Sequence, residues 1–203
     1  LPQFEGSKEL QMKIVKSLKG DKKIVITMPA YNASKTLEAT INEIPDYCYD
    51  SIIVVDDASS DNTVEIAQHL KAITKVIVHD HNQGYGGNQK SLYNAALEEG
   101  ADIVVLLHPD NQYNPAIVPN IVLPLLLDQS DVVFASRFIQ NPLEGGAWTG
   151  GMPLVKYFVN RALTTLQNWM MGTYFTEFHT GYRAYNRHAI ESVNYEKMSN
   201  DFV

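Results

Sequence analysis

The chain has a single cysteine, Cys48, among its 203 residues, so no disulfide can form within it. A reducing compartment is then the simpler expectation, and we expect the protein in the cytoplasm or at the cytoplasmic face of a membrane. The longest nearly apolar stretch is 116–127, and two prolines and an asparagine interrupt it. Such a stretch is too short and too broken to cross a bilayer, and a peripheral membrane contact is compatible with it.

Basic and glycine-rich recognition signals are also scarce. The net charge is −7 and no long run of Lys and Arg occurs, so nucleic acid is not expected as a partner. No G-x-G-x-x-G follows the first predicted strand, and no G-x-x-x-x-G-K-[ST] occurs. A dinucleotide-dependent dehydrogenase and a P-loop enzyme therefore lose their main support. Any phosphate must be bound locally, by a metal, a few Arg residues or backbone N–H groups.

Short apolar runs alternate with segments of helical spacing. The runs predict strands at 24–28, 52–55, 75–78, 103–107 and 132–135, and the spacing predicts helices at 35–44, 63–70, 88–99, after Pro115 and at 153–172. Strands that are apolar throughout indicate an α/β fold with a mostly parallel central sheet and helices on both faces. We expect a peripheral helix over 1–20 and one catalytic domain over 21–203, truncated at its C-terminus.

Polar residues follow every predicted strand, and the carboxyl ends of parallel strands meet at one edge of the sheet. This clustering predicts a single site. Of the adjacent pair Asp56 and Asp57, only one side chain can face a given ligand. Asp57 could accept hydrogen bonds from a ribose or a base, or it could cap its own loop.

The segment after the fourth strand carries an alternating trio, His108, Asp110 and Gln112. In extended backbone the three side chains point the same way. An imidazole, a carboxylate and an amide oxygen would then converge on one point, a ligand set that suits Mg²⁺ or Mn²⁺ and leaves positions for diphosphate oxygens.

Several segments together resemble the large inverting glycosyltransferase family 2, in particular its dolichyl- and polyprenyl-phosphate mannosyl- and glucosyltransferases. The resemblance spans roughly 23–187, and the segments that carry it are Pro29–Asn32, Val55–Thr63, Asn82–Gly84, His108–Pro115, Ser136–Phe138 and Thr180–Tyr185. It implies a GT-A-type, Rossmann-like fold and a metal-bound nucleotide-sugar donor.

The resemblance also implies roles for single residues. Those implied to bind the nucleotide are Pro29, Ala30, Tyr31, Asn32, Asp57 and Gly84. Asp110 would bind the metal, with His108 and Gln112 beside it, and His108 stands where the family has the first acid of Asp-x-Asp. Arg137 and Arg183 would contact phosphate, which suits the bidentate guanidinium fork. Glu177 is the candidate general base for a hydroxyl acceptor, or else holds Arg183 or a loop.

The function implied is transfer of a hexose from a UDP- or GDP-sugar to a polyprenyl or dolichyl phosphate, with inversion, in cell-envelope or glycan synthesis. Two alternatives stay open at this point: a transferase that acts on a hydroxyl of a glycan, and a nucleotide-sugar-binding module whose metal motif decayed at His108. The helix predicted at 153–172, which contains Phe158 and Trp169, either packs in the core or faces lipid.

Overall fold

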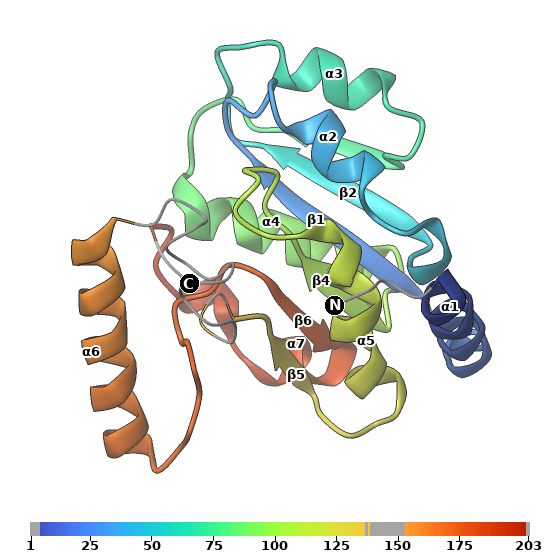
Figure 1. Cartoon of the computed structure of the whole chain (residues 1–203). Coiled ribbons are helices and arrows are strands. Elements are labelled where there is room, and N and C mark those ends of the chain that lie inside the picture. Colours follow the sequence, from blue (N-terminus) through green and yellow to red (C-terminus); the bar gives the residue numbers. More distant parts are fainter. Residues whose placement is uncertain (1–4, 137, 139–152, 202–203) are drawn as a thin grey trace. The chain divides into compact units, whose positions relative to one another are not determined.

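The computed structural model describes residues 5–136, 138 and 153–201 (Figure 1). Its helices are α1 (Glu5–Lys19), α2 (Leu37–Asn42), α3 (Thr63–His69), α4 (Gly84–Glu98), α5 (Val118–Leu126), α6 (Leu154–Met171) and α7 (Arg187–Ser192), with 3₁₀ turns at Asp46–Cys48, Pro115–Ile117 and Tyr195–Lys197. Its strands are β1 (Ile24–Ala30), β2 (Ser51–Asp56), β3 (Lys75–Val78), β4 (Ile103–Leu106), β5 (Val132–Phe134) and β6 (Arg183–Asn186).

The six strands form one sheet in the order β3-β2-β1-β4-β6-β5. β1 pairs in parallel with β2 and with β4, and β3 pairs in parallel with β2. β6 runs antiparallel to β4. The five strands predicted from apolar runs are confirmed. β6 escaped the sequence analysis because it reads Arg-Ala-Tyr-Asn, a mixed and short run without the pattern of a buried strand.

Helices cover both faces of the sheet centre. Every residue of β2 and β4 is buried, and so are six of the seven residues of β1. Because successive side chains of a strand point to opposite faces, a wholly buried strand must be covered on both. α4 packs on β1 and β2, and α5 packs on β4 and β6.

The chain divides into two compact units, one made of 1–133 and 183–203 and the other of 134–182. In the second unit α6 ends at Gly172, which takes the left-handed conformation. One stripe of α6 is apolar and exposed, with Phe158 63% and Trp169 81% accessible. No helix within the described residues is both long and apolar enough to cross a membrane.

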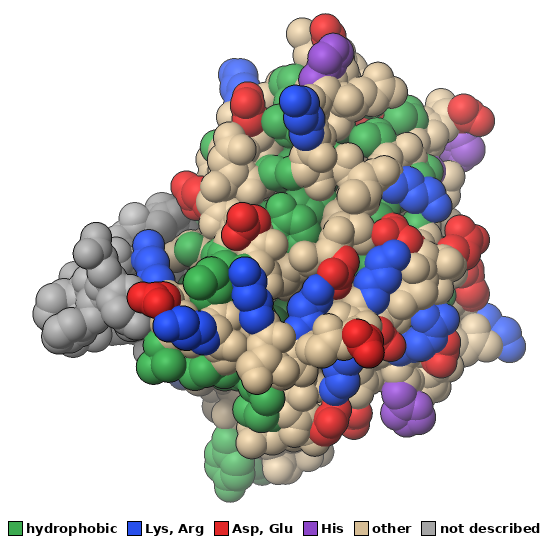
Figure 2. Space-filling model, turned by 90° about the vertical axis from the view of Figure 1, so that its right-hand side faces the viewer, with side chains coloured by type: hydrophobic (Ala, Val, Ile, Leu, Met, Phe, Trp, Pro, Cys, Tyr) green, Lys and Arg blue, Asp and Glu red, His purple; other side chains and the backbone are tan. Residues whose placement is uncertain are grey.

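Charges of both signs intermingle on the face of the first unit seen in Figure 2. Ion pairs among the described residues include Lys22 with Asp128 at 2.9 Å and Lys23 with Glu99 at 3.1 Å. Pairs that stay in contact with water contribute little to stability, at most about 1 kcal/mol each.

Candidate functional site

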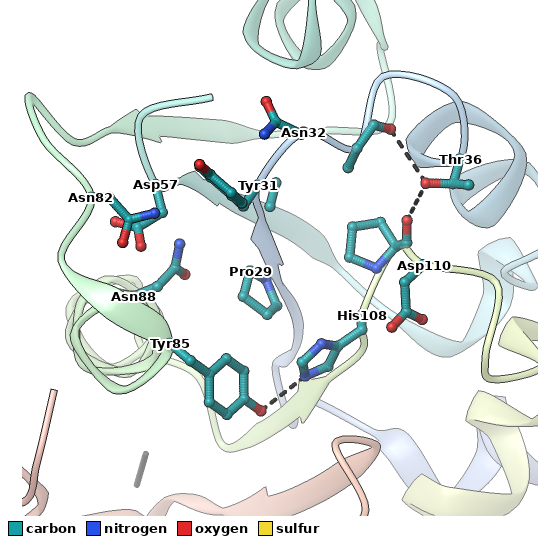
Figure 3. Close-up of a pocket in the computed structure, with 13 residues that line it drawn as sticks. Pro29, Tyr31, Asn32, Thr36, Asp57, Asn82, Tyr85, Asn88, His108 and Asp110 are labelled. Atoms are coloured by element: carbon teal, nitrogen blue, oxygen red, sulfur yellow. Dashed lines mark hydrogen bonds between the residues drawn. The ribbon is translucent and has the colours of Figure 1, made fainter. Parts of the chain in front are cut away.

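A cavity of about 480 Å³ opens at the carboxyl ends of β1, β2 and β4 (Figure 3). Its walls come from the ends of these strands, the loops that follow them and the start of α4. The residues that line it are Pro29, Ala30, Tyr31, Asn32, Ala33, Thr36, Asp57, Asn82, Tyr85, Asn88, His108, Pro109 and Asp110. The predicted meeting of strand ends therefore produces one shared cavity.

The loop after β1 is held by side chains from the loop after β2. The backbone N–H groups of Asn32 and Ala33 donate to the hydroxyls of Ser59 and Thr63, both at 2.8 Å. The Asn32 side chain accepts in return from the backbone N–H of Ser60, at 2.9 Å. Asn32 itself has φ +51°, a conformation that asparagine tolerates better than most residues. Hydrogen bonds in both directions therefore hold this wall of the cavity, made by Pro29, Ala30, Tyr31 and Asn32, against the loop that follows β2.

The two adjacent aspartates have different tasks. Asp56 turns back to its own loop, where one carboxylate oxygen accepts from the Ser59 N–H at 2.8 Å. Asp57 lines the cavity, although only 4% of it is exposed. Its Oδ1 accepts from His79 Nδ1 at 2.7 Å and from the Gln83 N–H at 2.8 Å. Asp56 thus caps the loop that follows β2, whereas the nucleotide-binding role of Asp57 stays a prediction.

Asn88 contributes a second buried acceptor beside Asp57. Its Nδ2 donates to the carbonyl of Val55 at 2.9 Å, which fixes the amide. Its Oδ1 has no hydrogen-bond partner among the described residues, and the residue is 2% exposed. Asp57, Asn82 and Asn88 gather at one end of the cavity in Figure 3, away from His108 and Asp110.

His108 is held by a hydrogen-bond chain from α4. Gln89 Nε2 donates to the Tyr85 hydroxyl at 3.0 Å, and this hydroxyl lies 2.9 Å from His108 Nε2. Burial lowers the pKa of His108, an effect that Arg183 reinforces and Asp110 opposes. Burial also raises the pKa of Tyr85. Tyr85 therefore engages His108 Nε2 in a hydrogen bond, and the tautomer of His108 decides which of the two atoms donates.

The backbone after β4 differs from the extended form that the alternating trio predicted. Asn111 has φ +59°, and Asp110 Oδ1 accepts from the Gln112 N–H at 3.0 Å, so the chain turns here. Asp110 and His108 reach the cavity, whereas Gln112 is not among the residues that line it. The backbone is thus not extended through the trio, because the turn breaks the period of two, and the metal-binding role of Gln112 stays a prediction.

The described residues contain no group of three or more His, Cys, Asp or Glu side chains placed to hold a metal ion. Asp110 is exposed in the cavity and offers a carboxylate. A single protein carboxylate still fits Mg²⁺ or Mn²⁺ when a diphosphate supplies further oxygens, because such ions keep few protein ligands at nucleotide sites. The donor set is thus compatible with a cation that arrives with its ligand.

The other predicted residues lie apart from the cavity lining. Gly84 has φ +81°, and a Cβ added to it would come within 2.7 Å of the Asn200 carbonyl oxygen, so a close backbone approach accounts for this glycine. Its contact with nucleotide stays a prediction. Arg183 lines a smaller cavity of about 110 Å³ beside Tyr93 and Tyr185.

Two predicted residues cannot be related to the cavity. Arg137 lies outside the described residues. Glu177 belongs to the second unit, where it is 2% exposed. Their roles stay predictions.

Tyr85, Asn88 and His79 were missed by the sequence analysis. Tyr85 and Asn88 belong to the glycine-rich segment, whose glycines were its only residues assigned a role from the sequence. A helix that begins at Gly84 brings residues one and four positions later to the sheet edge, and this spacing is the signal that could have identified both.

Comparison with known proteins agrees with this geometry. Residues 25–193 match the family model described as Glycosyl transferase family 2. A UDP-N-acetylglucosamine–dolichyl-phosphate N-acetylglucosaminyltransferase from Methanococcus voltae is 33% identical over 189 residues, which cover 86% of this chain and 73% of the relative. An undecaprenyl-phosphate mannosyltransferase from Micrococcus luteus is 25% identical over 180 residues, covering 87% and 71%.

A solved structure of glucosyl-3-phosphoglycerate synthase from Mycobacterium tuberculosis, with Mn²⁺, UDP and glucosyl-3-phosphoglycerate, matches with a TM-score of 0.69 at 22% identity. The match covers 95% of this chain, which spans 64% of the length of that structure. At this identity the likeness shows the fold alone, and the predicted GT-A-type α/β fold is confirmed.

Proposed function

Since the chain belongs to glycosyl transferase family 2, we propose that it transfers a hexose from a nucleotide-diphosphate sugar to a polyprenyl or dolichyl phosphate. One observation carries the proposal: a single cavity at the carboxyl ends of β1, β2 and β4 has a buried acceptor, Asp57, at one end and an exposed carboxylate, Asp110, at the other. The two ends suit a base and a diphosphate, respectively.

The base end recognises N–H groups. Asp57 and Asn88 both present oxygen, and a uracil or guanine ring offers an N–H at its recognition edge. Pro29 and Tyr31 lie between this end and His108 in Figure 3, where a ribose would fit. The donor is therefore a UDP- or GDP-sugar, in keeping with the uridine nucleotide named in the Methanococcus relative.

The diphosphate end relies on Asp110. A divalent cation held there, Mg²⁺ or Mn²⁺, would supply positive charge to the departing nucleoside diphosphate. Tyr85 engages His108 Nε2 in a hydrogen bond, so His108 is proposed to shape this wall and not to bind the cation through Nε2. Arg137 and Arg183 are the proposed phosphate contacts, because a guanidinium binds phosphate oxygens in a bidentate manner.

The acceptor is proposed to be a lipid phosphate, as in the two named relatives. Such an oxyanion attacks the anomeric carbon without a base, and the sugar–phosphate bond breaks as the new bond forms on the opposite face, which inverts the configuration. Glu177 would act as a general base only with a hydroxyl acceptor. The exposed apolar stripe of α6 is proposed to contact the lipid at the membrane surface. Transfer of the Phe158 and Trp169 side chains from water into an apolar environment lowers the free energy.

A transfer assay tests the proposal. The protein is incubated with radiolabelled UDP- and GDP-hexoses, dolichyl phosphate and Mn²⁺ or Mg²⁺, and the labelled lipid is extracted. We expect label in the lipid fraction with one donor, and a loss of at least about a hundredfold in Asp110→Asn, the scale seen when a group that stabilises transition-state charge is removed. Donor binding without transfer to any lipid or glycan would instead favour a nucleotide-sugar-binding module.

A further inference from the structure

A buried hydrogen-bond chain behind the cavity ends on Asp57. Its members are Ser91 on α4, His79 just after β3, and Asp57 just after β2. His79 Nε2 lies 2.9 Å from Ser91 Oγ, and His79 Nδ1 lies 2.7 Å from Asp57 Oδ1. His79 is 8% exposed and is not among the residues that line the cavity.

The chain has a direction. Nδ1 faces a carboxylate oxygen, which can only accept, so Nδ1 must carry the hydrogen. On the other side of the ring Nε2 meets the Ser91 hydroxyl, which can donate or accept, so this contact suits Nε2 with or without a hydrogen. The backbone also fixes the position of His79. Its N–H donates to the Asp56 carbonyl at 2.9 Å, next to the paired residues Asp56 and Val78.

This arrangement determines which oxygen of Asp57 serves the cavity. Oδ1 already accepts two hydrogen bonds, from His79 and from the Gln83 N–H. No described residue donates to Oδ2, which is the oxygen left for a ligand. The last torsion of an aspartate is broad, so without the His79 donor the carboxylate plane could rotate about it. A rotated carboxylate would no longer meet a base edge in line.

We propose that His79 is a positioning residue for nucleobase recognition: it fixes the plane of Asp57 so that Oδ2 meets the ring N–H of the base. This inference rests on the proposed function. It predicts selection for bases that have such an N–H. Uracil and guanine donate from a ring nitrogen at this edge, whereas the corresponding nitrogen of cytosine is a bare acceptor that the carboxylate repels.

Two conservative variants separate the two hydrogen bonds of His79. The amide nitrogen of an asparagine falls near the position of Nδ1, so His79→Asn keeps the donor to Asp57 and loses the Ser91 contact. The amide of a glutamine falls near Nε2, so His79→Gln keeps the Ser91 contact and loses the donor to Asp57. Glutamine is close to histidine in volume and asparagine is smaller, so any loss of packing falls mainly on His79→Asn, the variant expected to keep its affinity.

Isothermal titration calorimetry with UDP, GDP and CDP in the presence of Mn²⁺ provides the test, and inorganic pyrophosphate with Mn²⁺ probes the other end of the cavity. We expect wild-type protein to prefer UDP or GDP over CDP. His79→Gln should lose about tenfold in affinity for the preferred nucleotide, the order expected for one hydrogen bond to a charged group. Its preference over CDP should shrink, whereas His79→Asn should stay within about threefold of wild type. Pyrophosphate should bind all three proteins alike.

The inference is overturned if His79→Gln keeps both affinity and preference. It is overturned equally if nucleotide and pyrophosphate affinities fall together, since that would indicate a general structural role. The variant Asp57→Asn distinguishes a wrong assignment of the base end from a wrong proposed function. If wild type binds UDP or GDP but Asp57→Asn binds equally well, the assignment of the base end is wrong and the inference about His79 falls with it. If wild type binds no nucleoside diphosphate, the proposed function itself fails.

Discussion

At the scale of single residues, the site depends on side chains that are held by others. Tyr85 is the clearest case, since its hydroxyl receives a hydrogen from Gln89 and faces His108 Nε2. His108 is thus held in place in the wall of the cavity. Its orientation depends on one phenol.

Replacing Tyr85 by Phe removes that phenol oxygen and leaves both neighbours without it. We expect a loss of about 1–3 kcal/mol in the free energy of unfolding, the cost of leaving buried polar groups unsatisfied. Urea denaturation followed by circular dichroism measures it. Tyr174→Phe is the matched control, because Tyr174 is 99% exposed, and it should change stability by less than about 0.5 kcal/mol. Equal values for the two variants would contradict the role given to Tyr85.

What the sequence can predict at this scale is the residue type at each strand end, not the direction of each side chain. Asp57 and Asp110 could be identified because they follow buried strands. The separate tasks of Asp56 and Asp57 depend on which oxygen meets Ser59 or His79, and such contacts arise only once β2 and β3 are paired. The backbone at Gln112 differs from the expected one for a related reason: the period of two holds only while the backbone stays extended, and Asn111 ends it.

At the scale of elements, the start of α4 is a packing junction. The Gly87 N–H donates to the Asn200 carbonyl at 3.0 Å, and Lys90 Nζ donates to the Met198 carbonyl at 2.6 Å. The glycine-rich segment therefore lets a distant strip of backbone approach the helix. The glycines at the start of α4 are thus needed for close backbone packing, whatever they contribute to ligand binding.

Two glycines allow this reading to be tested at equal backbone strain. Gly84 and Gly100 have φ of +81° and +83°, but a Cβ meets the Asn200 carbonyl oxygen at the first and nothing within 4 Å at the second. Gly100→Ala should cost about 1 kcal/mol for the left-handed conformation alone. Gly84→Ala should cost about 1–3 kcal/mol more, because backbone must move. Denaturant midpoints measure both, and similar losses would show that the contact with Asn200 is unimportant.

α6 provides the second test at this scale. Replacing Phe158 by Ser and Trp169 by Gln together should weaken sedimentation with vesicles of phosphatidylcholine and phosphatidylglycerol by about tenfold or more, because each large apolar side chain contributes about 1.5–3 kcal/mol on leaving water. Affinity for UDP or GDP should not change. Leu10→Gln removes a comparable exposed side chain from α1 and should leave sedimentation unaltered. Parallel losses of vesicle and nucleotide binding would argue against a lipid-facing α6.

At the scale of the whole molecule, periodicity alone was enough for the α/β class and five of the six strands, because buried parallel strands are apolar throughout. The addition of β6 could not be foreseen, since it joins the sheet through β4 and not through its own composition. The GT-A-type fold was expected from several short segments taken together. The second unit, 134–182, is richer in aromatic residues than the rest of the chain, since both tryptophans lie in it, but composition alone does not show where a compact unit begins and ends.

The net charge of −7 bears directly on the central claim. An acidic protein repels a nucleoside diphosphate, and Asp110 adds a negative charge inside the cavity itself. Binding of a nucleoside diphosphate therefore requires local positive charge, which we propose comes from a divalent cation at Asp110.

Calorimetric titration of UDP and GDP with Mn²⁺ or with EDTA measures this requirement most directly. One nucleotide should bind at least about tenfold more tightly with Mn²⁺, and Asp110→Asn should abolish that gain. Asp128→Asn, which removes an exposed carboxylate that pairs with Lys22, should retain the full cation effect. Nucleotide binding that is equally tight in EDTA, or a gain that persists in Asp110→Asn, would contradict the account.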